Sequence, residues 1–462
     1  MTSGAPSPGL SDVLCRHIAE LPFASLPDAS ARAAKHALLD AVGVMLAASG
    51  ASADAAPFIA LARSGGAGPC AILGTGARVT APFAALANGA LAHALDYEDT
   101  FDAAPCHPNA SLVPATLALA QALAPIDGRR LVSALALGCD LVCRLALSLR
   151  RAMEEGGWYP PPILGALGAA AAAARITGLD AIQTRDALSL VLCQATAPGE
   201  IQHSGRTVIR AVREAFPAQA AVLSALLARD GVRGFEAPLE GRAGFYRLYV
   251  DGRFDERAML EGLGTRFWGE RLSFKPWPAC RGTHAFIEAA LELRARHGVD
   301  WRRIEAITVL VGPVQRMLVD PPLRKQAPQT VIDAKFSIPF AAALALVRGR
   351  VTLDDFTDEA LADPQVRALA GRVTARDDPD SRTSAGGALL VKLMDGSTLQ
   401  ASVPMPLGCP DRPLSREALI AKFVDCAARA ARPITASRAE QIAHRLLGID
   451  TEPDSGRVFD LL

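Results

Sequence analysis

A dense group of acidic and imidazole side chains lies in the run HALDYEDTFDAAPCHPNAS, residues 93 to 111. The segments on either side, APFAALANGALA and LVPATLALAQALA, consist mainly of alanine, leucine and other apolar residues. Carboxyl and imidazole groups gathered on a loop between rigid elements are what general acid and base catalysis requires. The group comprises His93, Asp96, Glu98, Asp99, Asp102 and His107.

The arrangement of this run depends on where the flanking helices end. If the helix that begins at Ala81 continues to Asp96, then His93 and Asp96 lie three residues apart on one helical face. The proline-containing loop that follows would bring His107 back to the start of the next helix. On this interpretation Glu98, Asp99 and Asp102 are scaffold or solvent-facing acids, outside the site itself.

Two other interpretations of the run stay open. In a purely structural one, Asp99 and Asp102 are solvated loop acids, Asn109 is a helix N-cap and His93 is a hydrogen-bonded core histidine. The other is a metal site, but the spacing matches neither an HExxH motif nor an EF-hand loop, and no second cluster of histidine or cysteine supports it. We therefore expect no metal.

Two stretches of the helical part offer further candidates. GGWYPPPILGALG places Tyr159 at a stiff, proline-rich helix entry, where it could line a pocket or simply fill a helix junction. HSGRTVIRAVREAF carries Arg206, Arg210 and Arg213 on one predicted helical face. Arginine forks suit carboxylates, although a solvated helix face is an equally simple interpretation.

The stretch FKPWPACRGTHAF, residues 274 to 286, contains further candidate site residues and lies outside the alanine-rich helical segments. Lys275 lies before two prolines, Cys280 and Arg281 follow, and Thr283 with His284 opens a predicted helix. A helix N-terminus is a natural docking place for an anionic group. Cys280 has no visible activating base, so we interpret it as a residue that lines a pocket.

The charge composition of the chain indicates which kinds of binding partner to expect. The chain has 462 residues, and its 48 basic and 48 acidic residues form no long block of one sign, so we expect neither nucleic acid nor a membrane as partner. A small-molecule carboxylate held by a few local charges is easier to accommodate. Nine scattered cysteines without a CxxC pair, and an N-terminus without a secretory pattern, indicate a soluble cytoplasmic protein.

The residue composition and the predicted secondary structure of the chain change near residue 266. Before it, long alanine- and leucine-rich segments are separated by short Gly or Pro breaks, as in a helical bundle, and Asp180 is a candidate helix cap. After it, residues 304–312 read as a strand, and residues 387–403 read as a hairpin around Asp395 and Gly396. From Pro413 the chain turns helical again.

These patterns predict a mainly α protein in which an insertion interrupts a helical domain. The large all-helical domain is built from both chain ends, residues 1–267 and 406–462. A smaller α/β (α+β) lid domain, residues 268–405, is inserted between them. A cleft between two such domains is where a ligand site is expected.

Several segments, in their order and spacing, resemble the MmgE/PrpD family. They are ANGALAHALDYEDT with the following HPNASLVPA, GWYPPPILGALGAAAAAARITGLD, FKPWPACRGTHAFIEAALEL and AKFSIPFAAALALV. Known members include 2-methylcitrate dehydratase, cis-aconitate decarboxylase and iminodisuccinate epimerase. The resemblance covers nearly the whole chain. It implies a homodimer, a helical domain with an inserted lid, and chemistry on small di- or tricarboxylates without cofactor or metal.

The resemblance also implies roles for individual residues. Asp96 and Thr100 match the acidic motif of the family and His107 matches the histidine of its HP pair. Lys275 matches the lysine of the KP motif, and His284 matches the histidine of the TH pair. Among these, Thr100 is assigned to substrate binding and the others to catalysis.

Three positions depart from the family pattern. Tyr159 stands where characterised members have histidine, Arg210 stands where they have lysine, and Cys280 stands where the decarboxylase type has histidine but dehydratase-like members usually have cysteine. A tyrosine can still donate a proton, and an arginine can still hold a carboxylate. With Arg281, both Arg210 and Cys280 are assigned to substrate binding.

The mechanism that follows is removal of a proton from carbon next to a carboxylate, where fixed cations must neutralise an enolate-like charge. Lys275 and Arg210 would hold the carboxylate, His107 with Asp96 would transfer protons, and Tyr159 or His284 would protonate a departing hydroxide. We expect a hydroxyacid dehydratase of the 2-methylcitrate dehydratase type. Decarboxylation of the cis-aconitate type, epimerisation of an amino or imino dicarboxylate, and a catalytically inactive homologue are the alternatives.

Overall fold

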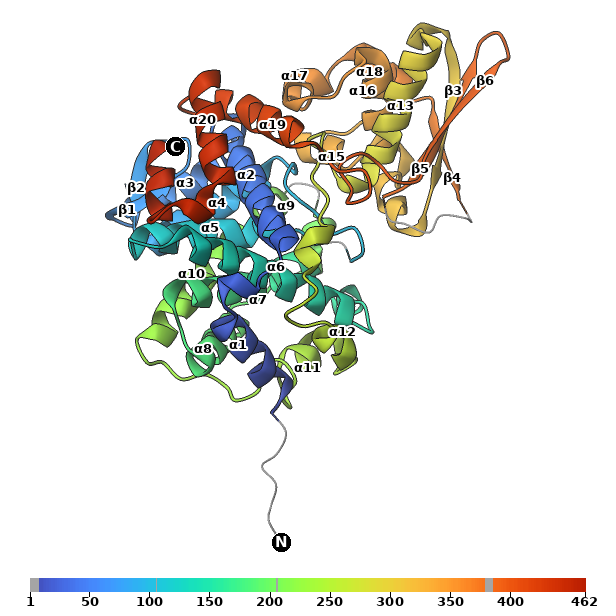
Figure 1. The fold of residues 1–462 in the computed structure, drawn as a ribbon. Coiled ribbons are helices and arrows are strands. Elements are labelled where there is room, and N and C mark those ends of the chain that lie inside the picture. The colour runs from blue at the N-terminus through green and yellow to red at the C-terminus, as the bar shows by residue number, and fades with distance from the viewer. Residues whose placement is uncertain (1–7, 105, 205–206, 379–384) are drawn as a thin grey trace. The chain divides into compact units, whose positions relative to one another are not determined.

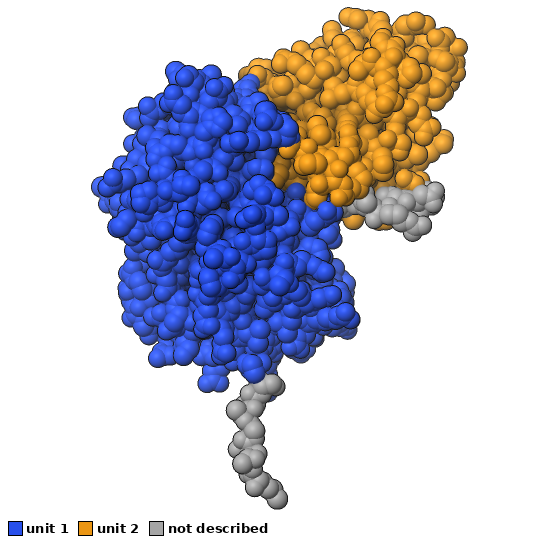
Figure 2. Space-filling view, in the orientation of Figure 1, with its two compact units in different colours: residues 1–272, 415–462 blue, residues 273–414 orange. Residues whose placement is uncertain are grey.

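The computed structural model describes residues 8–104, 106–204, 207–378 and 385–462, so Arg206 lies outside the described residues. The chain divides into two compact units, unit 1 (residues 1–272 and 415–462) and unit 2 (residues 273–414), which are blue and orange in Figure 2. The sequence predicts the boundaries of the insertion at residues 268 and 405, and the structure has them at 273 and 414. The predicted fold class, mainly α with a small α/β portion, is confirmed.

Unit 1 is a helical assembly with one short two-stranded ribbon (Figure 1). Its helices are α1 (Leu10–Glu20), α2 (Asp28–Ala51), α3 (Ala56–Ser64), α4 (Ala81–Ala94), α5 (Pro108–Ala122), α6 (Gly128–Ser148), α7 (Pro160–Thr177), α8 (Ala181–Leu192), α9 (Ile209–Val212), α10 (Ala215–Arg229), α11 (Phe245–Val250), α12 (Glu256–Leu260), α19 (Arg416–Ala428) and α20 (Ala436–Leu447). The ribbon pairs β1 (Ala67–Ile72) with β2 (Ala77–Val79) in antiparallel fashion.

Helix α7 is the central helix of unit 1. It packs against α5, α6, α8 and α10, and the alanines from residue 169 to 174 are fully buried. Small residues let these helices approach closely. A Cβ on Gly168 would come within 2.8 Å of the Gly138 carbonyl oxygen on α6 and even closer to the Val142 side chain. The glycine pair therefore sets the approach of α6 and α7.

The two ends of the chain meet within unit 1. Helix α19 packs along α2, and α20 also contacts α2. Lys35 on α2 forms an ion pair with Asp450 at 3.0 Å, and the N–H of Gly128 at the start of α6 donates to the Glu452 carbonyl at 2.9 Å. The predicted return of the C-terminal helices to the first bundle is thus correct.

Helix α6 is the one helix in the described residues that is long and apolar enough by itself to cross a membrane, with a mean hydropathy of 1.8 over an 18-residue window. However, 89% of that window is buried inside the structure. A helix that is apolar on all sides and covered by other helices is typical of the core of a large domain.

A side chain caps the start of α8 but not the start of α2. Asp180 caps α8 as predicted, because its side chain accepts from the Gln183 N–H in a capping box. At α2, Asp28 is the first helical residue, Pro27 occupies the N-cap position, and Ser30 Oγ donates to Glu270.

Unit 2 combines a four-stranded sheet with helices. The strands are β3 (Ile304–Val311), β4 (Val373–Asp377), β5 (Gly387–Leu393) and β6 (Thr398–Val403), in the order β4-β3-β5-β6. The helices are α13 (His284–His297), α14 (Pro322–Gln326), α15 (Val331–Lys335), α16 (Ile338–Arg348), α17 (Asp358–Leu361) and α18 (Pro364–Ala370). β3 pairs parallel to β4 and antiparallel to β5, and β5 pairs antiparallel to β6.

One face of this sheet forms the core of unit 2. Ile304, Ile307, Val309 and Val311 of β3 are buried together with apolar residues of α13 and α16, which Figure 1 shows on the same side of the sheet. The hairpin predicted at residues 387–403 is confirmed, with Gly396 in the left-handed region at φ 85°. Residues 331 to 348 form two helices, α15 and α16, with Phe336 and Ser337 between them.

Candidate active site

The acidic run forms the loop between α4 and α5. Helix α4 ends at Ala94, so the predicted continuation to Asp96 is wrong. Asp96 has a φ of 49°, a left-handed conformation that costs a residue with a Cβ about 1–2 kcal/mol and that aspartate adopts more readily than most residues. Its N–H donates to the His93 carbonyl at 2.8 Å. The chain therefore turns sharply at Asp96, and residues 96–101, including Thr100, are all buried.

A lysine from the C-terminal helix α19 holds this loop. Lys422 Nζ donates to Asp40 Oδ1 on α2 and to the Tyr97 carbonyl, both at 2.7 Å. The Lys422 ammonium also lies 3.8 Å from the centroid of the Tyr97 ring. The side chains of Lys422 and Asp40 are 7% and 0% exposed, so this ion pair is desolvated. The position of the loop thus depends on residues from both ends of the chain.

Two histidines contact Glu98 at the base of the loop. His93 Nδ1 is hydrogen-bonded to Glu98 Oε1, and His107 Nδ1 lies 3.1 Å from the same oxygen. We call these three residues the histidine–glutamate cluster. The side chains of His93 and Glu98 have no exposed surface, whereas that of His107 is 16% exposed. His107 is therefore the member of the cluster that a ligand can reach.

The surroundings of His107 fix its tautomer. Its Nδ1 lies 2.9 Å from the backbone carbonyl oxygen of Asp99, in addition to the Glu98 contact. A carbonyl oxygen can only accept a hydrogen bond, so Nδ1 must carry the proton. The lone pair of the neutral ring then lies on Nε2, on the side of the ring away from Glu98. This is the arrangement of an imidazole prepared to accept a proton.

Asp99 is buried beside the cluster. Asn109 Nδ2 donates to Asp99 Oδ2 at 3.0 Å, and Asp99 Oδ1 is buried without a hydrogen-bond partner among the described residues. Burial raises the pKa of Asp99 to about 7, against the lowering effect of the Asn109 hydrogen bond, and the charges of Asp40 and Glu98 add to the rise. The predictions of a solvated Asp99 and of Asn109 as an N-cap are wrong, because Asn109 lies in the first turn of α5, after His107 at the N-cap position.

His93 has the burial of a core histidine. Burial and the nearby charge of Arg213 lower its pKa more than the carboxylates of Glu98 and Asp96 raise it. The ring is therefore neutral at neutral pH. Its Nε2 is buried and has no hydrogen-bond partner in the described part of the chain, so His93 is not the fully hydrogen-bonded core residue of the structural interpretation.

A buried arginine links the cluster to the start of α7. The Arg213 guanidinium lies 5.1 Å from the centroid of the Tyr159 ring, and Arg213 Nε donates to Glu214 Oε1 at 3.0 Å. Burial alone would lower the pKa of Arg213, but the neighbouring Tyr159, Glu214, Glu98 and Asp96 raise it overall. Arg213 is thus a fixed cation in the same electrostatic environment as the histidine–glutamate cluster.

Arg210 lies in the short helix α9, which ends at Val212 before Arg213. Arg210 and Arg213 therefore do not share one continuous helical face as predicted. Arg213 Nη1 donates to the backbone carbonyl of Arg210 at 3.1 Å. Arg213 is buried and Arg210 is half-buried, so the sequence pattern grouped two residues with different environments.

The remaining candidates lie together at the start of unit 2. Lys275 and His284 are fully buried, Arg281 is 6% exposed and Cys280 is half-buried. His284 opens α13, as predicted. Its Nε2 lies 3.0 Å from the Ala279 carbonyl and its Nδ1 lies 3.4 Å from Arg281 Nη1, so both ring nitrogens have protein partners.

Comparison with known proteins identifies the family. The model of the MmgE/PrpD N-terminal domain matches residues 12–257, and that of the MmgE/PrpD C-terminal domain matches residues 277–447. The chain belongs to the MmgE/PrpD family. The resemblance of the sequence motifs is thereby confirmed over nearly the whole length.

Relatives within the MmgE/PrpD family include two kinds of lyase. The cis-aconitate decarboxylase-like protein oryM of Aspergillus oryzae is 26% identical, with 100% of this chain and 99% of the relative aligned. Cis-aconitate decarboxylase of Homo sapiens is 28% identical over 75% of this chain and 72% of its own length. 2-Methylcitrate dehydratase of Cupriavidus necator is 30% identical over 41% of this chain and 40% of its own length.

The structure places the residues matched to MmgE/PrpD motifs in two groups. Unit 1 brings Asp96, Thr100 and His107 into one buried loop, and Tyr159 lies beside Arg213. The second group, in unit 2, contains Lys275, Cys280, Arg281 and His284. The catalytic and binding roles given to all of these residues remain predictions.

Sequence reasoning missed two residues of the unit 1 group. Glu98 was set aside as a scaffold or solvent-facing acid, yet it is fully buried between two histidines. The only available signal was its place within the acidic run. Arg213 was noted for its spacing, and nothing in the local sequence distinguishes it from an exposed arginine.

The histidine–glutamate cluster could also hold a metal ion, because one ligand atom from each residue lies within 4.8 Å of the others. His107 Nδ1 donates to the Asp99 carbonyl, so in this tautomer Nε2 is the ring nitrogen of His107 with a lone pair for a metal. The same Nε2 lone pair is the one that would accept a proton.

Proposed function

We propose that this protein is a cofactor-independent lyase that removes a proton from carbon next to a carboxylate of a small di- or tricarboxylate. Dehydration of a hydroxyacid is the first candidate reaction. The observation that carries the proposal is the fixed tautomer of His107, whose Nδ1 faces Glu98 and the Asp99 carbonyl. Its Nε2 is left to accept a proton at the partly exposed side of the ring.

In a dehydration, His107 Nε2 takes the proton from carbon while the bond from the neighbouring carbon to the hydroxyl breaks. The electron pair of the former C–H bond forms the C=C bond, and the departing hydroxide receives a proton and leaves as water. Glu98 stabilises the imidazolium that forms. Tyr159 is the preferred proton donor to the hydroxide, because His284 already has partners on both nitrogens.

The developing negative charge on the substrate needs a fixed cation nearby. Arg213 is a buried guanidinium in the environment of the cluster, close to Tyr159. Arg210, a cation assigned from the family resemblance, lies in the same unit, and the Arg213 guanidinium donates to its backbone carbonyl. Cysteine at position 280, usual among dehydratase-like members, also favours dehydration over decarboxylation.

Decarboxylation is the second candidate, and the extent of similarity supports it. The decarboxylase-like relative aligns with all of this chain, whereas the dehydratase of Cupriavidus necator aligns with 41% of it. In that reaction the C–C bond to a carboxylate breaks, carbon dioxide leaves, and a protonated His107 delivers a proton to carbon. One proton transfer then suffices.

The experiment that tests the proposal is a substrate screen on the purified protein. Citrate, 2-methylcitrate, malate-like hydroxyacids and cis-aconitate are incubated in heavy water and followed by ultraviolet absorbance and NMR. A new C=C bond without gas release indicates dehydration, carbon dioxide release from cis-aconitate indicates decarboxylation, and exchange of a C–H proton alone indicates epimerisation. No turnover and no exchange with any of these carboxylates would contradict the proposal.

A further inference from the structure

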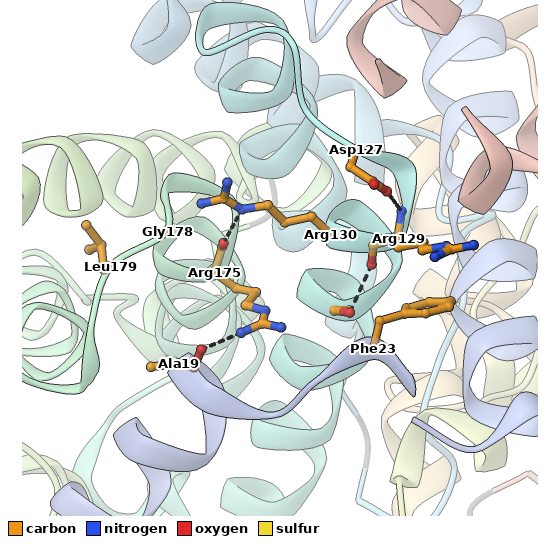
Figure 3. A pocket seen from close by; sticks show the side chains of 9 residues that line it. Ala19, Phe23, Asp127, Arg129, Arg130, Arg175, Gly178 and Leu179 are labelled. Carbon is orange, nitrogen blue, oxygen red and sulfur yellow. Dashed lines mark hydrogen bonds between the residues drawn. The ribbon is translucent and has the colours of Figure 1, made fainter. Parts of the chain in front are cut away.

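A cavity of about 380 Å³ in unit 1 is lined by three arginines (Figure 3). Arg129 and Arg130 come from the first turn of α6, and Arg175 comes from the last turn of α7. Phe23 and the end of α1 complete much of the wall. A volume of this size lies within the range of small-ligand sites.

The positive charge of this cavity is not balanced. Within the described ranges, none of the three arginines forms an ion pair, taken as a distance of up to 4.0 Å between a guanidinium nitrogen and a carboxylate oxygen. The one carboxylate in the lining is Asp127, which is exposed and caps α6 by accepting from the Arg129 N–H at 2.7 Å. The lining therefore carries three guanidinium groups and one carboxylate, which already accepts a hydrogen bond from backbone.

Hydrogen bonds to backbone hold two of the guanidinium groups in place. Arg130 Nε donates to the Arg175 carbonyl at 3.0 Å, and Arg175 Nη2 donates to the Leu21 carbonyl at 2.6 Å. Figure 3 also shows the bond from Arg175 to the Ala19 carbonyl at the end of α1. These bonds fix the positions of the cations but leave their charge uncompensated.

Holding the charged guanidinium groups of Arg130 and Arg175 partly away from water costs free energy when no anion lies beside them. Burial lowers the pKa of Arg130 and of Arg175, and the charge of Arg130 lowers that of Arg175 further. Arg175 Nε is buried and has no hydrogen-bond partner among the described residues. Arg129 Cζ lies 5.8 Å from the centroid of the Phe23 ring, which leaves the edge of its guanidinium available as a donor.

We propose that this cavity is a binding site for a small polyanion, of the phosphate or polycarboxylate class. Arginine forks recognise both classes by paired N–H donors. The site is separate from the candidate active site, because Arg175 and Tyr159 lie at opposite ends of α7, whose 18 residues span about 27 Å. The inference does not depend on the proposed function.

The test is calorimetric titration of the full chain with inorganic phosphate, pyrophosphate and citrate at low ionic strength. The variants Arg129→Gln, Arg130→Gln and the double variant remove one or two cations without touching the bonds of Arg175 to α1. Arg233→Gln is the matched control, because Arg233 is an exposed arginine of unit 1 outside the cavity lining. Circular dichroism and thermal unfolding verify that each variant is folded.

We expect saturable binding of at least one anion to wild type and to Arg233→Gln, with affinity at least ten-fold weaker in the double variant. Preference for pyrophosphate or for citrate assigns the ligand to the phosphate or the polycarboxylate class. Citrate can also enter the candidate active site, so its titration is repeated on His107→Ala, which should retain the site sensitive to Arg129 and Arg130. Absence of binding by all three anions, or equal binding by wild type and the double variant, would overturn the proposal.

Discussion

At the scale of single residues, the proposed chemistry rests on the buried neighbours that orient the partly exposed ring of His107. Glu98 contacts both histidines of the cluster, because its Oε1 is hydrogen-bonded to His93 Nδ1 and lies 3.1 Å from His107 Nδ1. A carboxylate in that position orients the ring and stabilises its protonated form, as the aspartate of a catalytic triad does. In the proposed mechanism Glu98 is therefore a positioning residue that acts through His107.

The variant Glu98→Gln tests this role. We expect turnover to fall about 10- to 100-fold, the usual loss when a residue that orients a catalytic ligand is changed. The acid limb of the pH–rate profile should move to lower pH, because the neutral amide no longer stabilises an imidazolium. His107→Ala is the reference and should lose about 10²- to 10⁴-fold. A reduced rate with an unshifted profile would show that Glu98 has only a structural role.

The same residues test whether the protein works without a metal. Because the proposed mechanism uses the Nε2 lone pair of His107 as a base and needs no metal, we expect full activity after dialysis against EDTA. Elemental analysis of the dialysed protein is the control that any metal was removed. Loss of activity with EDTA and its return with one divalent ion would instead indicate that the histidine–glutamate cluster binds metal.

Asp99 makes stability depend on pH in a defined direction. Its pKa is raised by burial to about 7 in the folded state, from an ordinary value near 3.8. Between these two values the folded protein binds more protons than the unfolded chain, so this group's contribution to stability falls as pH rises from about 4 to 7.

Asp99→Asn should remove that contribution while keeping the bond from Asn109. We expect the variant to lose less stability than wild type between pH 4 and pH 7, measured as the midpoint of chemical unfolding at several pH values. Asp102→Asn, at a less buried position of the same loop, is the control and should follow the wild-type dependence. Parallel curves for wild type and Asp99→Asn would contradict the assignment.

At the scale of elements, the packing of α6 on α7 depends on a pair of glycines. A methyl group on Gly168 would lie 2.1 Å from Val142 Cγ2 and 2.8 Å from the Gly138 carbonyl, distances that require the helices to move apart. Overpacking of this kind costs about 1–3 kcal/mol, which outweighs the gain in helix propensity of up to about 1 kcal/mol.

Gly168→Ala should therefore lower the midpoint of thermal unfolding. Gly371→Ala is the matched control, because Gly371 has an ordinary right-handed conformation and its nearest contacts to an added Cβ lie at 3.5 Å or more. The control should be neutral or slightly stabilising. Equal midpoints for the two variants would mean that α6 and α7 separate without cost.

Elements whose signal is local were predictable from the sequence. The cap at Asp180 needs only its own neighbours, and the hairpin around Gly396 needs only a residue that tolerates positive φ. By contrast, the end of α4 and the turn at Asp96 lie in a loop that Lys422, more than 300 residues away, holds in place. The local pattern extended the helix to Asp96 because such a contact has no local signature.

The candidate site shows the same division. His107 and Lys275 could be named from motifs, because a family resemblance carries residue identities directly. The burial of Glu98 and the pairing of Arg213 with Tyr159 arise from tertiary packing, so the sequence alone placed Glu98 outside the site. Burial and neighbouring charges shift the pKa of titratable groups, and neither can be read from the local sequence.

At the scale of the whole molecule, the chain is a helical unit interrupted by a unit with its own core. Unit 2 is formed by one continuous stretch, residues 273–414, around a sheet and its covering helices. Unit 1 needs both chain ends, because α19 and α20 pack on α2 and Lys422 holds both Asp40 and the loop between α4 and α5. Insertions of this type are tolerated where each part buries its own apolar residues.

This organisation predicts different behaviour for two fragments. Residues 273–414 alone should unfold cooperatively on heating, since their core is complete. Residues 1–272 alone should not, because they lack the helices that cover α2, and the buried carboxylate of Asp40 loses its Lys422 partner, a change that costs about 3–5 kcal/mol when a buried ion pair is broken. Joining residues 1–272 to residues 415–462 through a flexible linker should restore a cooperative transition, measured by circular dichroism and calorimetry. Cooperative unfolding of residues 1–272 without the C-terminal helices would contradict the dependence of unit 1 on both chain ends.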